Sequence, residues 1–293
     1  MEGFALFTHI LIAHDLSHEA DVALRRAAQL ATQYQAKLTL LHVAEGQQSS
    51  SAVASLRVAA EQVLGERLAT YCHGNAEVRL EAGKPNEVIH QILGEGDVDL
   101  LVLGAHHKGR PELFTGTNLD RLARQSPVPV LLAVSEDDSP YQQGIVALDS
   151  SLCSCNALRH AYSLLPASGH LQAVNIFTLS GRLAKKEAEE RLAMQQQLIG
   201  QLLDDEACTL PQPGPQLEHL VVAGTLSASL DEVIAKRQPQ LLAIGRHNRG
   251  VLAQTLLTAD PTVGTPWTFE PDAPTALPGW WFSHGLDHEE SAA

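Results

Sequence analysis

The sequence predicts an α/β protein of two tandem domains, each built on a parallel sheet, and three observations support this fold class. The chain repeats itself: Asp15 returns as Asp149, and the segment 99–104 returns as 240–245. Short, nearly continuous apolar runs alternate with segments of helical periodicity, which is typical of parallel strands joined by right-handed helical crossovers. The length of 293 residues is also what two domains of ordinary size require.

The first copy shows this alternation from its start. The runs that predict strands are short and almost wholly apolar, and they lie at 9–13, 37–43, 78–80, 100–103 and 128–134. Between the first two runs, apolar residues recur three or four apart, so a helix is expected over 19–34 after the turn residues 15–17. A second helix is marked by the same spacing at Val53, Leu56, Ala60, Leu64 and Leu68.

The rest of the first copy continues the pattern. A third helix is expected through Val88, Ile89 and Ile92, with Asn86 as its candidate N-cap. A last helix is expected over 119–124, before the closing strand.

The second copy repeats this order, and then the repeat stops. Its expected strands are 145–148, 171–177, 218–222 and 241–244, and its best-supported helix runs over about 183–203. Ser139 and Pro140 form the natural linker, which sets the expected domains at 1–139 and 140–260. Nothing after Leu257 corresponds to the last helix and strand of the first copy.

The expected third region is an irregular tail over 261–293. Five prolines in this region argue against a long helix and make a central strand improbable, yet three tryptophans are costly to leave in water. We therefore expect either 265–270 or 280–282 to pack on a surface.

Composition excludes several classes of partner. The net charge of −14 argues against binding of nucleic acid or of an anionic membrane, because both depend on Lys and Arg. No apolar run approaches the roughly 20 residues of a membrane span, and the N-terminus lacks a basic secretory signal. Four cysteines at neither zinc nor disulfide spacing are expected to be reduced thiols. These features predict a cytoplasmic protein.

Candidate site residues gather where the strands of the first copy end. Asp15 follows the first strand, Val43 ends the second, and Gly104 follows the fourth. In open α/β sheets ligands bind beyond the carboxyl ends of the strands. A glycine-rich stretch that leads to a helix N-terminus, as 104–118 does, suits a phosphate. Asp15 would accept a hydrogen bond from a ribose hydroxyl or help to place a metal, or it would simply cap the following helix, as would Asp149.

Several motifs of the chain resemble the universal stress protein family in a tandem two-domain form. They are the strand-Asp-x-Ser opening, Leu40-Leu41-His42-Val43, Gly83-Lys84-Pro85, Leu103-Gly104 and the run 127–132. The resemblance covers about 7–135 and, less closely, about 143–258. It implies two flavodoxin-like, adenine nucleotide alpha hydrolase-like domains of three layers, packed as an intramolecular pseudo-dimer. It also implies a cytoplasmic stress-response protein, in a family of which one subgroup binds ATP.

The family's ATP-binding loop is altered in both copies. That loop has a glycine, two residues, a second glycine, nine residues and a final Gly-Ser or Gly-Thr. Here His107 replaces the middle glycine, and eight residues separate it from Gly116. In the second copy Asn248 replaces the middle glycine, and Thr258 begins the pair that stands in for the final one. Both replacements tolerate a positive φ, so the turn is compatible with them, although a side chain now faces the phosphate path.

The resemblance assigns nucleotide-binding roles to residues of each copy. In the first copy they are Ala13, His14, Asp15, Val43, Leu103, Gly104, His107, Gly109, Gly116, Thr117 and Asn118. In the second they are Asp149, Ile176, Gly245, Asn248 and Thr258. The expected ligand is ATP or AMP, with ATP accompanied by magnesium. No metal site of the protein's own is expected, since His106, His107 and His247 lack further ligands at suitable spacing.

The expected function is regulatory nucleotide binding in the first domain, without enzymatic turnover. The sequence shows no nucleophile–base pair and no paired carboxylates at usable spacing. Two alternatives stay open: an interaction scaffold whose degenerate loops bind no nucleotide, and a slow ATP hydrolase. Because 128–134 has no equal in the second copy, its apolar edge also predicts homodimerisation or pairing with the tail.

Overall fold

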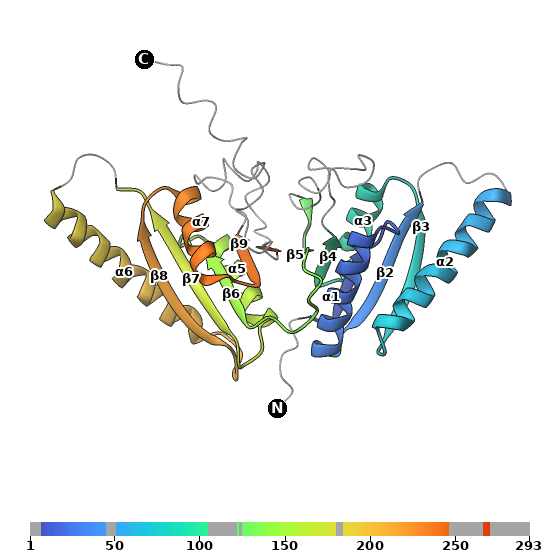
Figure 1. Ribbon diagram of the computed structural model, residues 1–293, viewed down its shortest axis with the longest axis horizontal. Coiled ribbons are helices and arrows are strands. Elements are labelled where there is room, and N and C mark those ends of the chain that lie inside the picture. The colour runs from blue at the N-terminus through green and yellow to red at the C-terminus, as the bar shows by residue number, and fades with distance from the viewer. Residues whose placement is uncertain are drawn as a thin grey trace, which may run out of the picture. The chain divides into compact units, whose positions relative to one another are not determined.

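The computed structural model describes residues 7–44, 51–104, 122, 125–179, 184–245 and 266–269, with the backbone alone for 51–57 and 266–269. The chain divides into two compact units, Met1–Pro140 and Tyr141–Ala293. Figure 1 labels the elements of unit 1 and unit 2 other than β1 and β10.

Unit 1 is a parallel sheet with helices in the crossovers. Its elements are β1 (His9–Ala13), α1 (His18–Tyr34), β2 (Lys37–Ala44), α2 (Ser51–Tyr71), β3 (Ala76–Ala82), α3 (Pro85–Gly94), β4 (Leu100–Gly104) and β5 (Val130–Ala133). The strand order is β3-β2-β1-β4-β5, and every neighbouring pair is parallel. Right-handed crossovers put α1 and α2 on one face of this sheet and α3 on the other. The predicted helix at 119–124 lies outside the described residues, apart from Leu122.

The central strands of unit 1 form because their residues are apolar on both sides. Ile10 lies between Leu38 of β2 and Leu100 of β4, and all three side chains are fully buried. α1 covers the sheet with its apolar face and ends at Gln35, whose left-handed φ of 55° lets the N–H of the next residue, Ala36, reach Ala31 O at 2.9 Å. These contacts make β1 the centre of the unit 1 core.

Unit 2 repeats the same layout. Its elements are β6 (Gln143–Ala147), α5 (Leu152–Leu164), β7 (His170–Phe177), α6 (Lys185–Ala207), β8 (Gln216–Ala223), α7 (Leu226–Arg237), β9 (Leu241–Gly245) and β10 (Pro266–Phe269). The strand order is β10-β9-β6-β7-β8. The pairs β6–β7, β6–β9 and β7–β8 are parallel, as their counterparts are in unit 1.

The tail packs on the protein within 265–270, as one of the two expected segments, but it does so as a strand and not as an irregular segment. Residues Pro266–Phe269 form β10, which pairs antiparallel with β9 so that Pro266 faces Gly245 and Phe269 faces Leu242. β10 therefore lies beside β9 as β5 lies beside β4, but in the opposite direction. Its proline stands at the first position of the strand, where the missing N–H is tolerated.

Two local predictions are also corrected. Asn86 is not the N-cap of α3: the cap position is Lys84, and the helix begins at Pro85, whose φ is preset for a first turn and whose missing N–H costs nothing there. The closing strand starts at Val130 and not at 128, because the Ser126 hydroxyl bonds both the carbonyl and the N–H of Val128 in a turn.

Candidate functional site

The edge of unit 1 where β1, β2 and β4 end is the candidate site. β1 has β2 on one side and β4 on the other, so the crossovers leave β1 and β4 in opposite directions along the sheet. Such a reversal opens a crevice at the carboxyl ends of the two strands, where ligands of this fold class bind. Six of the predicted residues lie in or directly after these strand ends: Ala13, His14, Asp15, Val43, Leu103 and Gly104. The predicted residues His107, Gly109, Gly116, Thr117 and Asn118 lie outside the described part of the chain.

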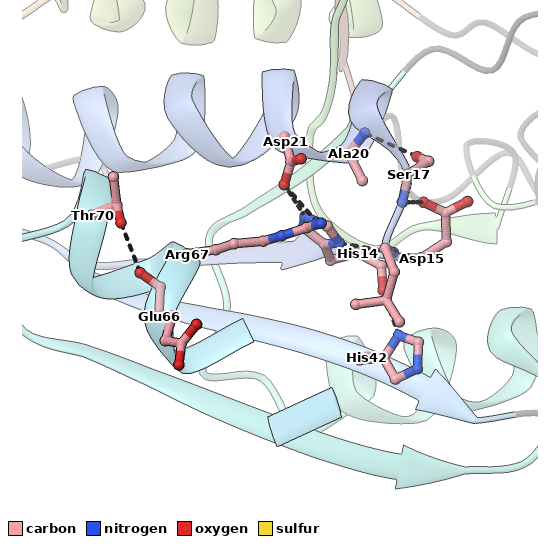
Figure 2. Close-up of polar contacts among 10 residues, drawn as sticks. His14, Asp15, Ser17, Ala20, Asp21, His42, Glu66, Arg67 and Thr70 are labelled. Carbon is pink, nitrogen blue, oxygen red and sulfur yellow. Dashed lines mark hydrogen bonds and ion pairs between the residues drawn. The ribbon is translucent and has the colours of Figure 1, made fainter. Parts of the chain in front are cut away.

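The loop after β1 is shaped by its own side chains. Asp15 Oδ1 accepts a hydrogen bond of 3.0 Å from Ser17 N, across Leu16, whose φ is 70°. Ser17 Oγ accepts 3.1 Å from Ala20 N and caps α1. Asp15 is therefore not the N-cap that the sequence left open. Asp15 instead stabilises the turn that places Ser17 at the cap position of α1 (Figure 2).

His14 is buried in a polar cluster beneath this loop. Its Nδ1 accepts 2.9 Å from Leu16 N, so its Nε2 carries the proton and donates 3.0 Å to Asp21 Oδ1. Arg67, from α2, donates 2.8 Å to the same oxygen (Figure 2). Burial lowers the pKa of His14, and the hydrogen bond to Asp21 opposes that shift. Because both ring nitrogens are used inside unit 1, the His14 ring offers no polar atom to a ligand.

Three residues at this edge were not among the predicted nucleotide-binding residues: Asp21, His42 and Arg67. His42 Nδ1 donates 2.7 Å to the carbonyl oxygen of His14. The signal that would have found His42 is a polar residue inside an otherwise apolar strand, matched in the second copy by Asn175. Asp21 and Arg67 gave no such signal, because charged residues on helices are usually solvated.

Gly104 has a structural explanation that involves no ligand. A Cβ at Gly104 would lie 2.5 Å from Glu19 O, in the first turn of α1. A Cβ at Gly245 would lie 2.4 Å from Cys153 C, at the matching place in the first turn of α5. Both glycines are therefore required by the close packing of a strand end on a helix backbone.

The second copy keeps the loop and loses the cluster. Asp149 Oδ1 accepts 3.1 Å from Ser151 N across Ser150, whose φ is 65°, and Ser151 caps α5. The positions of His14 and Asp21 are taken by Leu148 and Cys155, both buried.

The thiol of Cys155 is not activated. Burial, and then Glu206, raise its pKa to about 11. Of the remaining residues predicted in this copy, Ile176 is the next-to-last residue of β7 and Gly245 ends β9, while Asn248 and Thr258 lie outside the described residues.

The described residues give no positive evidence of a metal site, a membrane span or a disulfide bond. Within the described ranges, no three His, Cys, Asp or Glu side chains are grouped to hold a metal ion, and His106, His107 and His247 fall outside those ranges. No helix in the same ranges is long and apolar enough to cross a bilayer. The cysteines are free thiols: Cys72, Cys153, Cys155 and Cys208.

The chain is similar to known proteins in both sequence and fold. The sequence profile of the universal stress protein family matches residues 6–133 and 140–259. A Staphylococcus haemolyticus protein named for that family is 31% identical over 143 residues, which are 45% of this chain and 87% of the relative. A Staphylococcus aureus relative of the same name is 32% identical over 143 residues, 45% of this chain and 86% of its own.

Solved structures agree with the fold. A universal stress protein from Archaeoglobus fulgidus superposes with a TM-score of 0.60 at 16% identity, over 89% of this chain and 97% of that one. One from Pseudomonas aeruginosa gives 0.54 at 17% identity, over 91% and 94%. The flavodoxin-like α/β fold predicted from the sequence is confirmed. The chain belongs to the universal stress protein family, in the form that carries two copies of the domain.

Proposed function

We propose that this protein is a cytoplasmic stress-response regulator that binds one adenine nucleotide, ATP with magnesium or AMP, in unit 1. The observation that carries the proposal is the strand-order reversal at β1 and β4, where Asp15 is held in a shaped turn beside the ends of β2 and β4. In this arrangement the ribose would lie near Asp15 and the adenine near Val43. The phosphates would follow residues 104–117, of which Gly104 alone is described.

The difference between the two copies supports a single site. Unit 1 keeps a polar cluster under its loop, through His14, Asp21 and Arg67, whereas unit 2 has the apolar Leu148 and the unactivated Cys155 there. A polar ligand is better matched by the first edge than by the second. Unit 2 would then serve the fold or a protein contact and bind no nucleotide.

The proposed role is binding without turnover. A regulator needs the ligand to stabilise one state of the protein, and the nucleotide would do this by holding the loop after β1 against the end of β4. Hydrolysis would need a positioned base and a metal-bound water. We assign neither a catalytic base nor a residue that holds a metal-bound water, so hydrolysis is not the activity that we propose.

One observation favours a second candidate, an interaction scaffold that binds no nucleotide. The first turn of α1 carries Glu19 and Asp21, and acidic side chains near a helix N-terminus repel a phosphate. Asp21 is neutralised in part by Arg67, at 2.8 Å, whereas Glu19 forms no ion pair with another described residue.

The test is a binding titration with a matched pair of variants. Isothermal calorimetry with ATP and magnesium is expected to give one nucleotide per chain, and ATP at tenfold over its Kd should stabilise the protein by about 1.4 kcal/mol in a melting experiment. Asp15→Ala should abolish the heat of binding. Asp149→Ala is the control, because it removes the same aspartate-to-serine hydrogen bond in the other copy and should leave binding unchanged.

The outcomes separate the candidates. An absence of heat and of any melting shift at millimolar ATP would leave the scaffold as the better account. Two nucleotides per chain would contradict the assignment to unit 1 alone. Phosphate release above background would restore the hydrolase.

A further inference from the structure

Both copies make the same side-chain hydrogen bond at the point where their first strand leaves the sheet. In unit 1, His42 Nδ1 donates 2.7 Å to the carbonyl oxygen of His14. In unit 2, Asn175 Nδ2 donates 2.7 Å to the carbonyl oxygen of Leu148. Each donor lies on the second strand of its unit. The residue before it, Leu41 or Val174, supplies the carbonyl oxygen that accepts the backbone N–H of His14 or Leu148.

The backbone around the two bonds is equivalent. His14 N donates 2.8 Å to Leu41 O, and Leu148 N donates 2.9 Å to Val174 O. The copies have diverged in sequence, and the two donors differ in size and in chemical group, an imidazole in one copy and an amide in the other. What they share is one N–H at one place. Such agreement indicates that the loop needs the bond, whichever side chain supplies it.

The bond acts on the aspartate that follows. The carbonyl of His14 belongs to the peptide that joins His14 to Asp15, so a donor on that oxygen fixes the plane from which Asp15 projects. Beyond it, Leu16 N is held by the His14 ring, and Ser17 N is held by the Asp15 carboxylate. Of these side-chain contacts, the bond from His42 is the one that comes from another strand, and it adds to the backbone bond between His14 N and Leu41 O. It therefore ties the loop to the sheet.

We propose that His42 is a positioning residue that orients Asp15 for ligand binding, and that Asn175 holds the loop before Asp149 in the same way, without a role in ligand binding. The ligand part of this inference rests on the proposed function of unit 1, whereas the loop part does not. His42 acts through the backbone and not by touching the ligand. Its side chain can then be exchanged for the one that nature uses in the other copy.

The geometry also determines the state of the ring. A carbonyl oxygen can only accept, so Nδ1 of His42 carries a proton, and in the neutral ring Nε2 carries the lone pair. Nitrogen-15 NMR of the imidazole distinguishes this tautomer from the commoner one. Observation of the Nδ1–H form in the full-length wild-type protein is the first expected result.

The decisive experiment compares three full-length variants. His42→Ala removes the donor, His42→Asn replaces it with the donor of unit 2, and Asn175→Ala removes the donor of unit 2. Loss of one hydrogen bond corresponds to about a fivefold change in an equilibrium constant. His42→Ala should therefore raise the exchange rates of the Leu16 and Ser17 amides, and the Kd for ATP, by about fivefold each.

The control and the rescue sharpen the test. His42→Asn should restore both quantities to within about twofold of wild type. Asn175→Ala should speed amide exchange at Ser151 and leave the Kd for ATP unchanged. A purely structural role for His42 would alter exchange and stability without altering ATP affinity.

Three results would overturn the proposal. One is the Nε2–H tautomer at His42 in wild type; another is His42→Asn behaving like His42→Ala. The third is unchanged ATP affinity in His42→Ala. If wild type binds no ATP, the proposed function of unit 1 and the ligand-orienting role fail together, whereas the tautomer, amide exchange and asparagine rescue still decide whether His42 holds the loop.

Discussion

Arg67 and Asp21 form an ion pair of 2.8 Å that joins the second helix of unit 1 to the first. Asp21 Oδ1 also accepts a hydrogen bond from the Nε2–H of His14. One carboxylate oxygen therefore binds both a cation and a buried ring (Figure 2). Unit 2 joins the same two helices with the charges exchanged, through Arg159 on α5 and Glu206 on α6, at 2.8 Å. In both copies an ion pair therefore links the first helix to the second, although the residues that form it differ.

Removing the carboxylate of Asp21 should destabilise unit 1. In Asp21→Ala the buried Nε2–H of His14 loses its acceptor and Arg67 loses its partner, which together should cost about 2 kcal/mol. Urea denaturation followed by circular dichroism measures the loss. Glu87→Ala, which breaks an exposed pair with Lys84, is the control and should cost less than about 0.5 kcal/mol. Equal losses in the two variants would contradict the importance of the cluster.

A methyl group at either strand-end glycine should be poorly tolerated. In Gly104→Ala and Gly245→Ala the new Cβ meets helix backbone at 2.5 Å and 2.4 Å, and backbone cannot turn aside as a side chain can. We expect losses of about 3 kcal/mol or more, or failure to fold. Gly65→Ala is the matched control, since nothing lies within 4 Å of its Cβ, and alanine inside α2 should stabilise by up to about 1 kcal/mol. Thermal melting of the three proteins gives the comparison, and a mild effect at Gly104 would sink the packing argument.

The serine caps should be equivalent in the two copies. Ser17 Oγ accepts from Ala20 N, and Ser151 Oγ accepts from Ser154 N. Ser17→Ala and Ser151→Ala should each cost about 1 kcal/mol. Thr225 stands at the cap position of α7 without a side-chain cap bond, so Thr225→Ala should change stability by only a few tenths of a kcal/mol. Denaturation midpoints at constant slope provide the readout, and a Thr225 effect as large as the serine effects would refute this distinction.

Stability should fall as the solution becomes mildly acidic because of His160. Burial lowers the pKa of His160 from an ordinary value near 6.5 to about 4. Between these two pH values the unfolded chain binds more protons than the folded one, so the free energy of unfolding decreases as pH decreases. Between pH 7 and pH 5 the contribution of His160 should be about 2 kcal/mol. His14, whose pKa is also lowered by burial, acts with the same sign.

A substitution isolates the part due to His160. Urea denaturation of His160→Gln at pH 7 and pH 5 should show a smaller loss than wild type by about 2 kcal/mol, because the titrating ring is gone. His73→Gln, at an exposed position, should keep the wild-type dependence on pH. An identical pH dependence in wild type and His160→Gln would show that this ring does not titrate as its burial implies.

Much of the fold was predictable because the relevant signals are local. The helix predicted at 19–34 is observed as His18–Tyr34, and the strand predicted at 37–43 is observed as Lys37–Ala44. In both, the spacing of apolar residues reports which face is buried. The alternation of strands with helices predicted the parallel sheet, and the duplication predicted that the second copy repeats it.

The sequence was less informative where a contact between distant residues decides the structure. Nothing near Pro266 announces a strand, because β10 exists through its pairing with β9. Gly104 was predicted as a phosphate contact on its place in a motif, and the structure adds a contact with the α1 backbone that no spacing reveals. The site was harder than the fold for the same reason, since Asp21 and Arg67 meet across two helices.

The sequence by itself determined the class of this protein: two copies of an α/β unit, with the candidate residues at the ends of parallel strands, because periodicity and repetition are properties of the chain. Only the tertiary structure decided that His42 and Asn175 are counterparts and that His14 shares the oxygen of Asp21 with Arg67. Those relations depend on register between strands and on which helix faces which. Both are fixed by the packing of residues far apart in the chain.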